Sequence, residues 1–253
     1  MGIYLNPGAG QFLTARSSKI YVDKTMLLRE LDEVFGTEQR FVCVSRPRRF
    51  GKTMAANMVC AYYDRTVTEN VFSGLAIARA EGARGRRKCD VLRINMQEFL
   101  SRAKDMEGLL SRLRRIVLRD LLRAYPDVDY FDREDLVECM QDVYQEMQRS
   151  FVIVIDEWDC IFREYPHDTA AQREYLDFLR DWLKDKAYIG LVYMTGILPI
   201  KKYGTHSALN MFTEYSMEHP RGLAPFVGFT EDEVKGLCEK YGMDFAECRA
   251  LYD

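Results

Sequence analysis

The segment SRPRRFGKT, residues 45–53, ends in a glycine, a lysine and a threonine whose types and order suit the binding of phosphate groups. Gly51 lets the backbone approach a phosphate closely, Lys52 supplies positive charge, and the Thr53 hydroxyl is a ligand for Mg²⁺. The Walker A pattern, G-x-x-x-x-G-K-[ST], has its first glycine where this chain has Arg46. The N–H donors that matter most lie downstream of that position, so the sequence predicts a phosphate-binding loop, with a structural strand-to-helix turn as the alternative. The residues expected to bind a nucleotide here are Arg49, Phe50, Gly51, Lys52, Thr53 and Met54.

A second candidate site follows the apolar run FVIVI, residues 151–155. A buried strand that ends in Asp-Glu is the Walker B arrangement, in which the strand carries Asp156 to its carboxyl end to hold Mg²⁺ opposite Thr53. Glu157 is then placed to polarise an attacking water, a role that needs a carboxylate within hydrogen-bond reach. An acidic pair at a strand end is also found as a helix cap or in an ion pair. The Gly-Lys-Thr upstream favours the catalytic interpretation.

Three further residues give weaker signals. Thr195 ends the run IGLVYMT, where some ATPases place a polar sensor of the terminal phosphate, and a hydroxyl bonded to nearby backbone is an equal alternative. Asp159 is expected to support the metal, to hold a nearby arginine or to form a plain salt bridge. Trp158 is expected in the core. The three histidines have neither metal-ligand nor catalytic-triad spacing.

These residues need a sheet and helices to position them. Apolar runs predict strands at 41–45, 90–95, 151–155 and 189–195, with a weaker fifth at 213–217. Helical patterns alternate with them, which indicates an α/β fold: a three-layer P-loop domain around a mainly parallel sheet. Helices are expected at 51–63, 109–122, 132–148 with Asp132 as cap, 170–185, and 230–241 with a Thr230–Glu233 capping box, followed by a short helix near Phe245.

Composition limits the function classes. The 253 residues are 47% hydrophobic and 30% charged with a net charge of -3, which argues against a surface that is basic throughout. Two local basic patches, ARGRRK at 83–88 and the arginines of 112–123, are expected to be solvated faces. No apolar run is long enough for a membrane span, and no signal peptide is recognised. Seven scattered cysteines predict reduced thiols and a cytoplasmic location.

Long stretches of the chain resemble the AAA-ATPase-like family of bacterial proteins, which commonly carry a C-terminal PD-(D/E)XK nuclease-type domain. The matching stretches are YLNPGAGQF, IYVDKTMLL, SRPRRFGKT, VIVIDEWD, MTGILPIKKYGTHSALNMFTEYSM and VGFTEDEVKGLCEKYGM. The resemblance implies an ASCE-type (AAA-like) P-loop domain at 1–222 and the start of a helical lid at 223–253, without the nuclease-type domain. It also implies that Arg46 is usual for the family, and that Tyr21 and Asp23 lie near the nucleotide base.

The leading hypothesis is a Mg²⁺-dependent ATPase whose catalytic residues are Glu157, Lys52 and Thr195, whose metal ligands are Thr53 and Asp156, and whose nucleotide cycle moves the lid and a partner protein or effector domain. One alternative is a nucleotide-gated switch with negligible turnover. Another is a nucleic-acid-associated ATPase that binds through ARGRRK, Arg48 and Arg49. Arg221 is a candidate for sensing or completing the site, with a structural salt bridge as its alternative.

Overall fold

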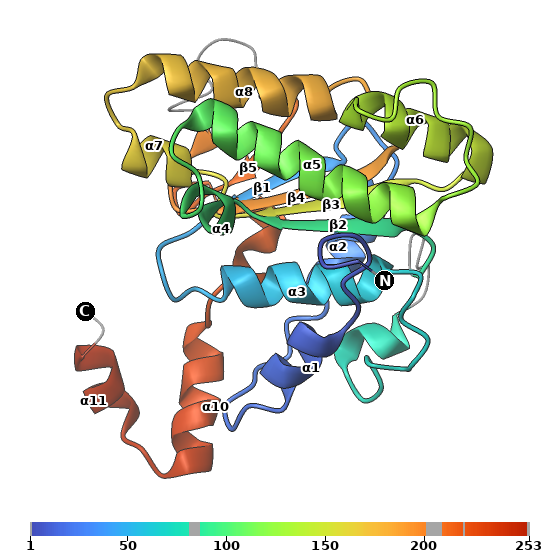
Figure 1. Cartoon of the computed structure of the whole chain (residues 1–253). Helices are drawn as coiled ribbons and strands as arrows, with labels where there is room; N and C mark the ends of the chain where they lie inside the picture. Colours follow the sequence, from blue (N-terminus) through green and yellow to red (C-terminus); the bar gives the residue numbers. More distant parts are fainter. Residues whose placement is uncertain (1, 81–86, 201–208, 220, 252–253) are drawn as a thin grey trace.

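The computed structural model describes residues 2–80, 87–200, 209–219 and 221–251. Its centre is a parallel sheet with the strand order β2-β3-β4-β1-β5 (Figure 1). The strands are β1 (Phe41–Ser45), β2 (Asp90–Asn95), β3 (Phe151–Asp156), β4 (Ile189–Gly196) and β5 (Thr213–Tyr215). The predicted α/β fold is confirmed, and the weak fifth strand is present but ends at Tyr215 rather than at 217. Since β4 lies between β1 and β3, one strand separates the two predicted motifs.

The strands are apolar on both faces because helices cover both faces of the sheet. In β3, Val152 and Val154 belong to one hydrophobic cluster, whereas Ile153 and Ile155 belong to the other. Every residue of β1, β3 and β4 is buried. This burial on two sides explains why the strands occur in the sequence as continuous apolar runs without polar alternation.

Two layers of helices flank the sheet (Figure 1). One layer contains α1 (Gly10–Arg16), α2 (Leu27–Val34), α3 (Lys52–Tyr63) and the short 3-10 helix η1 (Ala76–Arg79). The other contains α4 (Met96–Leu100), α5 (Met106–Ala124), α6 (Leu136–Met147), α7 (Cys160–Glu164) and α8 (Thr169–Leu183). Across the described ranges, every helix is too short or too polar to cross a bilayer.

The start of α6 differs from the sequence expectation. Asp132 was expected to cap this helix, but the cap is Asp135, whose Oδ1 accepts hydrogen bonds from the N–H groups of Val137 and Glu138 at 2.7 and 2.9 Å. Asp132 closes the preceding turn by accepting from the Glu134 N–H at 2.8 Å. The apolar period of α6 begins only after Asp135, so Asp135 is the residue whose side chain reaches the first free N–H groups. α8 covers 169–183 where 170–185 was expected.

After β5 the chain forms the 3-10 helix η2 (Arg221–Phe226), α10 (Glu231–Tyr241) and α11 (Phe245–Ala250). The predicted capping box of α10 is confirmed, because Thr230 and Glu233 each accept a hydrogen bond from the backbone N–H of the other. Figure 1 shows α10 and α11 away from the sheet, on the side of α1 and α3. We call η2, α10 and α11 the lid; the domain boundary at 222/223 stays a prediction.

Hydrogen bonds and an ion pair join the lid to the N-terminal segment 19–24. Lys24 Nζ lies 2.5 Å from both Glu233 Oε1 and the carbonyl oxygen of Pro225. The Tyr241 hydroxyl donates to the carbonyl of Lys19 at 2.6 Å. Segments from opposite ends of the chain are therefore held together beside α3.

Candidate functional site

The predicted phosphate-binding loop connects β1 to α3 at the carboxyl edge of the sheet. Two of its residues have left-handed backbone conformations, Arg49 with φ 70° and Gly51 with φ 73°. Gly51 adopts this conformation freely because it lacks a Cβ, whereas for Arg49 it costs about 1 kcal/mol. Turns that include left-handed residues direct successive N–H groups inward and form concave anion sites. The conformation of the loop therefore suits a phosphate group.

Lys52 is the first residue of α3, and only 6% of it is exposed. Its Nζ donates to the carbonyl oxygens of Arg46 and Pro47 at 3.0 and 2.9 Å. These bonds use two of the three N–H donors of an ammonium group. Burial lowers the pKa of Lys52, and the nearby negative charges of Glu157 and Asp156 oppose that shift. Lys52 thus lies within electrostatic range of the second predicted motif.

Asp156 ends β3 and is fully buried. Alternation along the strand places it on the sheet face that α3 covers, the face of Val152 and Val154. Its Oδ1 accepts from the Thr195 hydroxyl at 2.5 Å and from the Glu157 N–H at 3.1 Å. Its Oδ2 is buried without a hydrogen-bond partner in the described part of the chain. Thr195, which the sequence predicts as a sensor of the terminal phosphate, is therefore hydrogen-bonded to Asp156, the predicted Mg²⁺ ligand.

Glu157 has a left-handed backbone, with φ 55°. This conformation is uncommon for a glutamate, and such strain tends to occur at functional sites. The next residue is fixed by a hydrogen bond from the Trp158 N–H to the Thr195 carbonyl at 3.1 Å. The Glu157 side chain is 25% exposed, and its Oε2 lies 2.5 Å from Arg163 Nη2. Glu157 is thus a partly exposed carboxylate at this edge, in an ion pair with an arginine.

Asp159 is buried and faces the loop that follows β4. Its Oδ2 accepts from the N–H groups of Ile197 and Leu198 at 3.1 and 3.0 Å, and lies 3.3 Å from Arg163 Nε. Of the alternatives for Asp159, the structure contains the contact with a nearby arginine. Trp158 is fully buried in the core, as expected.

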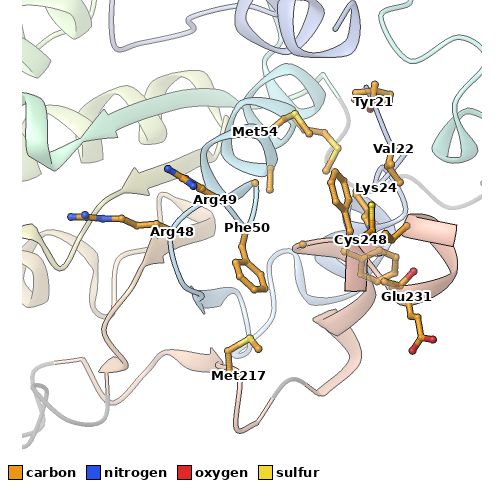
Figure 2. A pocket seen from close by; sticks show the side chains of 18 of the residues that line it. Tyr21, Val22, Lys24, Arg48, Arg49, Phe50, Met54, Met217, Glu231 and Cys248 are labelled. Atoms are coloured by element: carbon orange, nitrogen blue, oxygen red, sulfur yellow. The ribbon is translucent and has the colours of Figure 1, made fainter. Parts of the chain in front are cut away.

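A pocket of about 810 Å³ lies beside the phosphate loop, between the N-terminal segment, α3 and the lid (Figure 2). Residues of the loop, among them Arg49, Phe50 and Gly51, line it together with Met54 of α3. In Figure 2, the side chains of Arg48 and Arg49 extend away from Phe50. Aromatic rings from the N-terminal part of the chain, from the loop and from the C-terminal part line the pocket: Phe12, Tyr21, Phe50, Phe226, Phe229 and Phe245. The pocket thus offers stacking surface next to the predicted phosphate-binding loop.

The structure brings Tyr21 to this pocket, but not Asp23. Burial raises the pKa of Tyr21 to about 12. The Asp23 carboxylate accepts from the N–H and hydroxyl of Thr25 at 2.9 and 2.6 Å, and from the Ala76 N–H at 2.8 Å. Asp23 therefore joins the start of α2 to η1, and only Tyr21 of the pair lies where the base was expected.

The residues at the carboxyl edge fit a Mg²⁺ ion. Thr53 is exposed on the first turn of α3, and Asp156 Oδ2 has no donor among the described residues. No group of three or more His, Cys, Asp and Glu side chains capable of holding a metal occurs in the ranges that the structure covers. Mg²⁺ typically takes one or two protein oxygen ligands and completes its octahedron with phosphate and water oxygens. A site built from Thr53 and Asp156 agrees with that preference.

β1, the loop and α3 form one unit, and the acidic end of β3 lies one strand away from it. This is the arrangement of a P-loop ATPase. A family model described as predicted AAA-ATPase matches residues 9–205. The chain belongs to this AAA-ATPase-like family. The resemblance seen in the sequence is confirmed, and membership of this family supports a general ATPase role and the binding of ATP or ADP. A search of curated proteins found no match.

The site of this AAA-ATPase-like protein also includes residues that the sequence did not predict. Arg163 contacts Glu157, and its only sequence signal is its i+4 spacing from Asp159. Glu214 of β5 is buried and accepts from Ser45 Oγ at 3.0 Å and from the Ile200 N–H at 2.8 Å, without any signal in the sequence. The side chain of Arg221 and residues 83–86 of the ARGRRK patch lie outside the described residues.

Proposed function

We propose that this protein binds ATP with Mg²⁺ and hydrolyses it at the carboxyl edge of the sheet. The observation that carries the proposal is the proximity of two motifs, since the charges of Glu157 and Asp156 act on the buried Lys52 ammonium. Membership of a family of predicted ATPases supports the general reaction. Beyond that general reaction, the Mg²⁺ ion, the catalytic residues and the movement of the lid are part of our proposal.

The nucleotide binds with its phosphates at the loop and its base in the aromatic pocket. N–H groups of residues 49–53 and the positive end of the α3 dipole hold the phosphates. Lys52 exchanges a loop carbonyl for a phosphate oxygen and neutralises charge there. The base lies among the aromatic rings, with Tyr21 on one side of the pocket.

In the hydrolytic step, Glu157 accepts a proton from a water molecule as the water oxygen bonds to the terminal phosphorus and the bond to the ADP oxygen breaks. Thr53 and Asp156 would hold a Mg²⁺ ion, which would supply positive charge to neutralise the phosphate oxygens. Thr195 keeps the Asp156 carboxylate in one orientation through its hydrogen bond to Oδ1. Lys52 stabilises the negative charge that shifts toward the leaving oxygen.

The lid responds to the nucleotide because loop and lid are in direct contact. The Phe50 ring packs onto Gly228, where a Cβ would lie 2.7 Å from a ring carbon. The Lys24–Glu233 ion pair joins the lid to the segment that carries Tyr21. We propose that conversion of ATP to ADP changes these contacts and that the lid passes the change to a partner protein or effector domain.

Calorimetric titration with ATP and ADP, with and without Mg²⁺, tests the binding site. Lys52→Ala is expected to weaken ATP binding by about 10- to 100-fold, the value of a lost charge-assisted hydrogen bond. Unchanged thermal unfolding shows that the variant is folded. Equal affinity of the wild type and Lys52→Ala would overturn the proposal.

A second candidate function, a nucleotide-gated switch with negligible turnover, is favoured by one observation: the ion pair between Glu157 and Arg163 occupies one oxygen of the candidate base. Phosphate release from the wild type and from Glu157→Gln separates the two functions. The ATPase proposal expects release that falls by at least about 100-fold in Glu157→Gln, as for loss of a general base. ATP binding without any release that depends on Glu157 would favour the switch.

A further inference from the structure

Arg163 lies between the two carboxylates of the acidic segment that follows β3. Its Nη2 is 2.5 Å from Glu157 Oε2, and its Nε is 3.3 Å from Asp159 Oδ2. The three side chains differ in exposure: 18% for Arg163, 25% for Glu157 and 0% for Asp159. A single guanidinium thus joins an accessible carboxylate to a buried one.

The helix α7 determines where Arg163 lies. Asp159 precedes the first residue of α7, and Arg163 lies one helical turn later, so both side chains are on the same face. The intervening residues Cys160, Ile161 and Phe162 are buried in the core. Because the backbone of α7 is anchored by that packing, the guanidinium has little freedom to move away from the two acids.

Asp159 also contacts the residues that follow β4, the strand that carries Thr195. Its Oδ2 accepts from the N–H groups of Ile197 and Leu198, which follow β4 directly. A Cβ on Gly196 would lie 2.7 Å from Asp159 Oδ1, so the carboxylate is packed closely against the end of β4. Arg163 therefore connects Glu157 to the loop beside the sensor candidate.

Resting on the proposed function, we propose that Arg163 is a positioning residue for hydrolysis, which holds the Glu157 carboxylate with Oε2 turned to the protein and Oε1 left for the attacking water. A glutamate with a quarter of its side chain exposed has several rotamers, and a general base works only when its oxygen meets the water at hydrogen-bond distance. The bond to Arg163 selects one of them.

The second carboxylate explains why this arginine does not simply neutralise the base. One guanidinium shared by Glu157 and Asp159 leaves the three groups with a net charge of one negative unit. Only Glu157 of the two acids is accessible to solvent. Arginine suits the bridging position because its planar fork reaches two carboxylates at fixed angles, whereas a lysine ammonium acts as a single point charge.

The experiment compares Arg163→Met with the wild type in single-turnover phosphate release, ATP calorimetry and thermal unfolding. The release rate is expected to fall by about 100-fold, the effect of misplacing a catalytic group by about 1 Å. The ATP dissociation constant is expected to change by less than about threefold, because the contact acts on the transition state rather than on substrate binding. Arg163→Lys is expected to recover part of the rate. Arg173→Met is the matched control: Arg173 is exposed on α8, pairs with Asp177 at 3.9 Å, and its variant is expected to keep the full rate.

A double variant separates positioning from a general structural role. In the Glu157→Gln background, Arg163→Met is expected to reduce the rate by less than about twofold further, because effects of residues that act as one unit are not additive. An Arg163→Met enzyme that keeps or exceeds the wild-type rate would overturn the inference alone, since hydrolysis itself would stand. Equal losses in both backgrounds would overturn it too. No release from the wild type would overturn the hydrolytic proposal and this inference together.

Discussion

Asp90 and Asp156 are both fully buried carboxylates on neighbouring strands, but they lie at opposite ends of the sheet and in opposite surroundings. Asp90 begins β2. Its Oδ1 accepts from Asn6 Nδ2 at 2.6 Å and from Arg65 Nε at 2.8 Å. Its Oδ2 accepts from the Tyr125 hydroxyl and lies 3.6 Å from Arg149 Nη1. Both oxygens have cationic or polar partners.

Asp156 has such partners on one oxygen only. Oδ1 accepts from Thr195 and from its neighbour's backbone, whereas Oδ2 is without a donor among the described residues. A buried carboxylate oxygen without a partner is costly unless a cation or donor arrives. The comparison teaches that burial of an aspartate does not by itself identify a site: the network at Asp90 uses both carboxylate oxygens, whereas Asp156 keeps one oxygen for the Mg²⁺ ion that we propose.

The largest effect is expected from a substitution of Asp90, and it is a loss of stability. Asp90→Ala removes the acceptor of three side-chain hydrogen bonds and leaves Arg65 and Arg149 without their shared carboxylate. We expect a loss of about 3 kcal/mol in the free energy of unfolding, the low end for a broken buried pair because both arginine side chains are 31% exposed. Urea unfolding at neutral pH measures it. A loss below about 1 kcal/mol, the worth of a surface pair, would contradict the interpretation that the Asp90 network stabilises the fold.

A substitution of Asp156 is expected to change the affinity for the nucleotide rather than the stability. Asp156→Asn keeps an acceptor for Thr195 and is expected to change the free energy of unfolding by less than about 1 kcal/mol. The affinity for ATP in the presence of Mg²⁺ should fall by at least about tenfold, the lower end of the cost of losing even an outer partner of a metal site. Calorimetry with and without Mg²⁺ measures this, and the wild type without Mg²⁺ is the control. If Mg²⁺ improves ATP binding equally in both proteins, Asp156 is not a metal ligand.

The smallest effect concerns the reactivity of two cysteines, one near Asp90 and the other near the acidic segment that follows β3. Cys89 lies beside Asp90 and Cys160 beside the acidic segment, and both are buried cysteines outside any disulfide. Burial raises the pKa of each from 9.0 to about 12, so the thiolate fraction at pH 8 falls by roughly a thousandfold. Cys248 is only half-buried. Mass spectrometry after brief iodoacetamide treatment at pH 8 is expected to find label on Cys248 and none on Cys89 or Cys160. Equal labelling of all three would show that both ends of the sheet open readily.

Much of the fold could be predicted from the sequence because buried parallel strands and amphipathic helices have strong periodic signals. All five strands, the helix after the loop and the capping box of α10 follow from such signals. The cap of α6 is Asp135 rather than the predicted Asp132, and it was hard to predict because several acidic residues in this stretch are of a type that can cap a helix. The short helices α1, α2 and α7 have too few turns for a clear period.

The site could be predicted only as far as its motifs extend along the chain. Asp156 and Thr195 are hydrogen-bonded, and Lys52 lies within electrostatic range of Asp156, because each follows or ends a strand at the same edge. Asp23 bonds to Thr25 and to the start of η1, and its assignment to the nucleotide base stays a prediction. The partners of Asp90 come from four distant segments, and no pattern along the sequence indicates such a meeting.

The link between the lid and the N-terminal segment has a consequence for the order in which this protein is made. Lys24 and Glu233 are 209 positions apart, and Tyr241 and Lys19 are 222 apart. A ribosome releases the N-terminal residues first, and domains begin to fold as they emerge. Tyr21 and its neighbours therefore leave the ribosome about 200 residues before the opposite wall of the pocket. If this pocket binds the nucleotide as we propose, the sheet and its loop begin to fold before the site is complete.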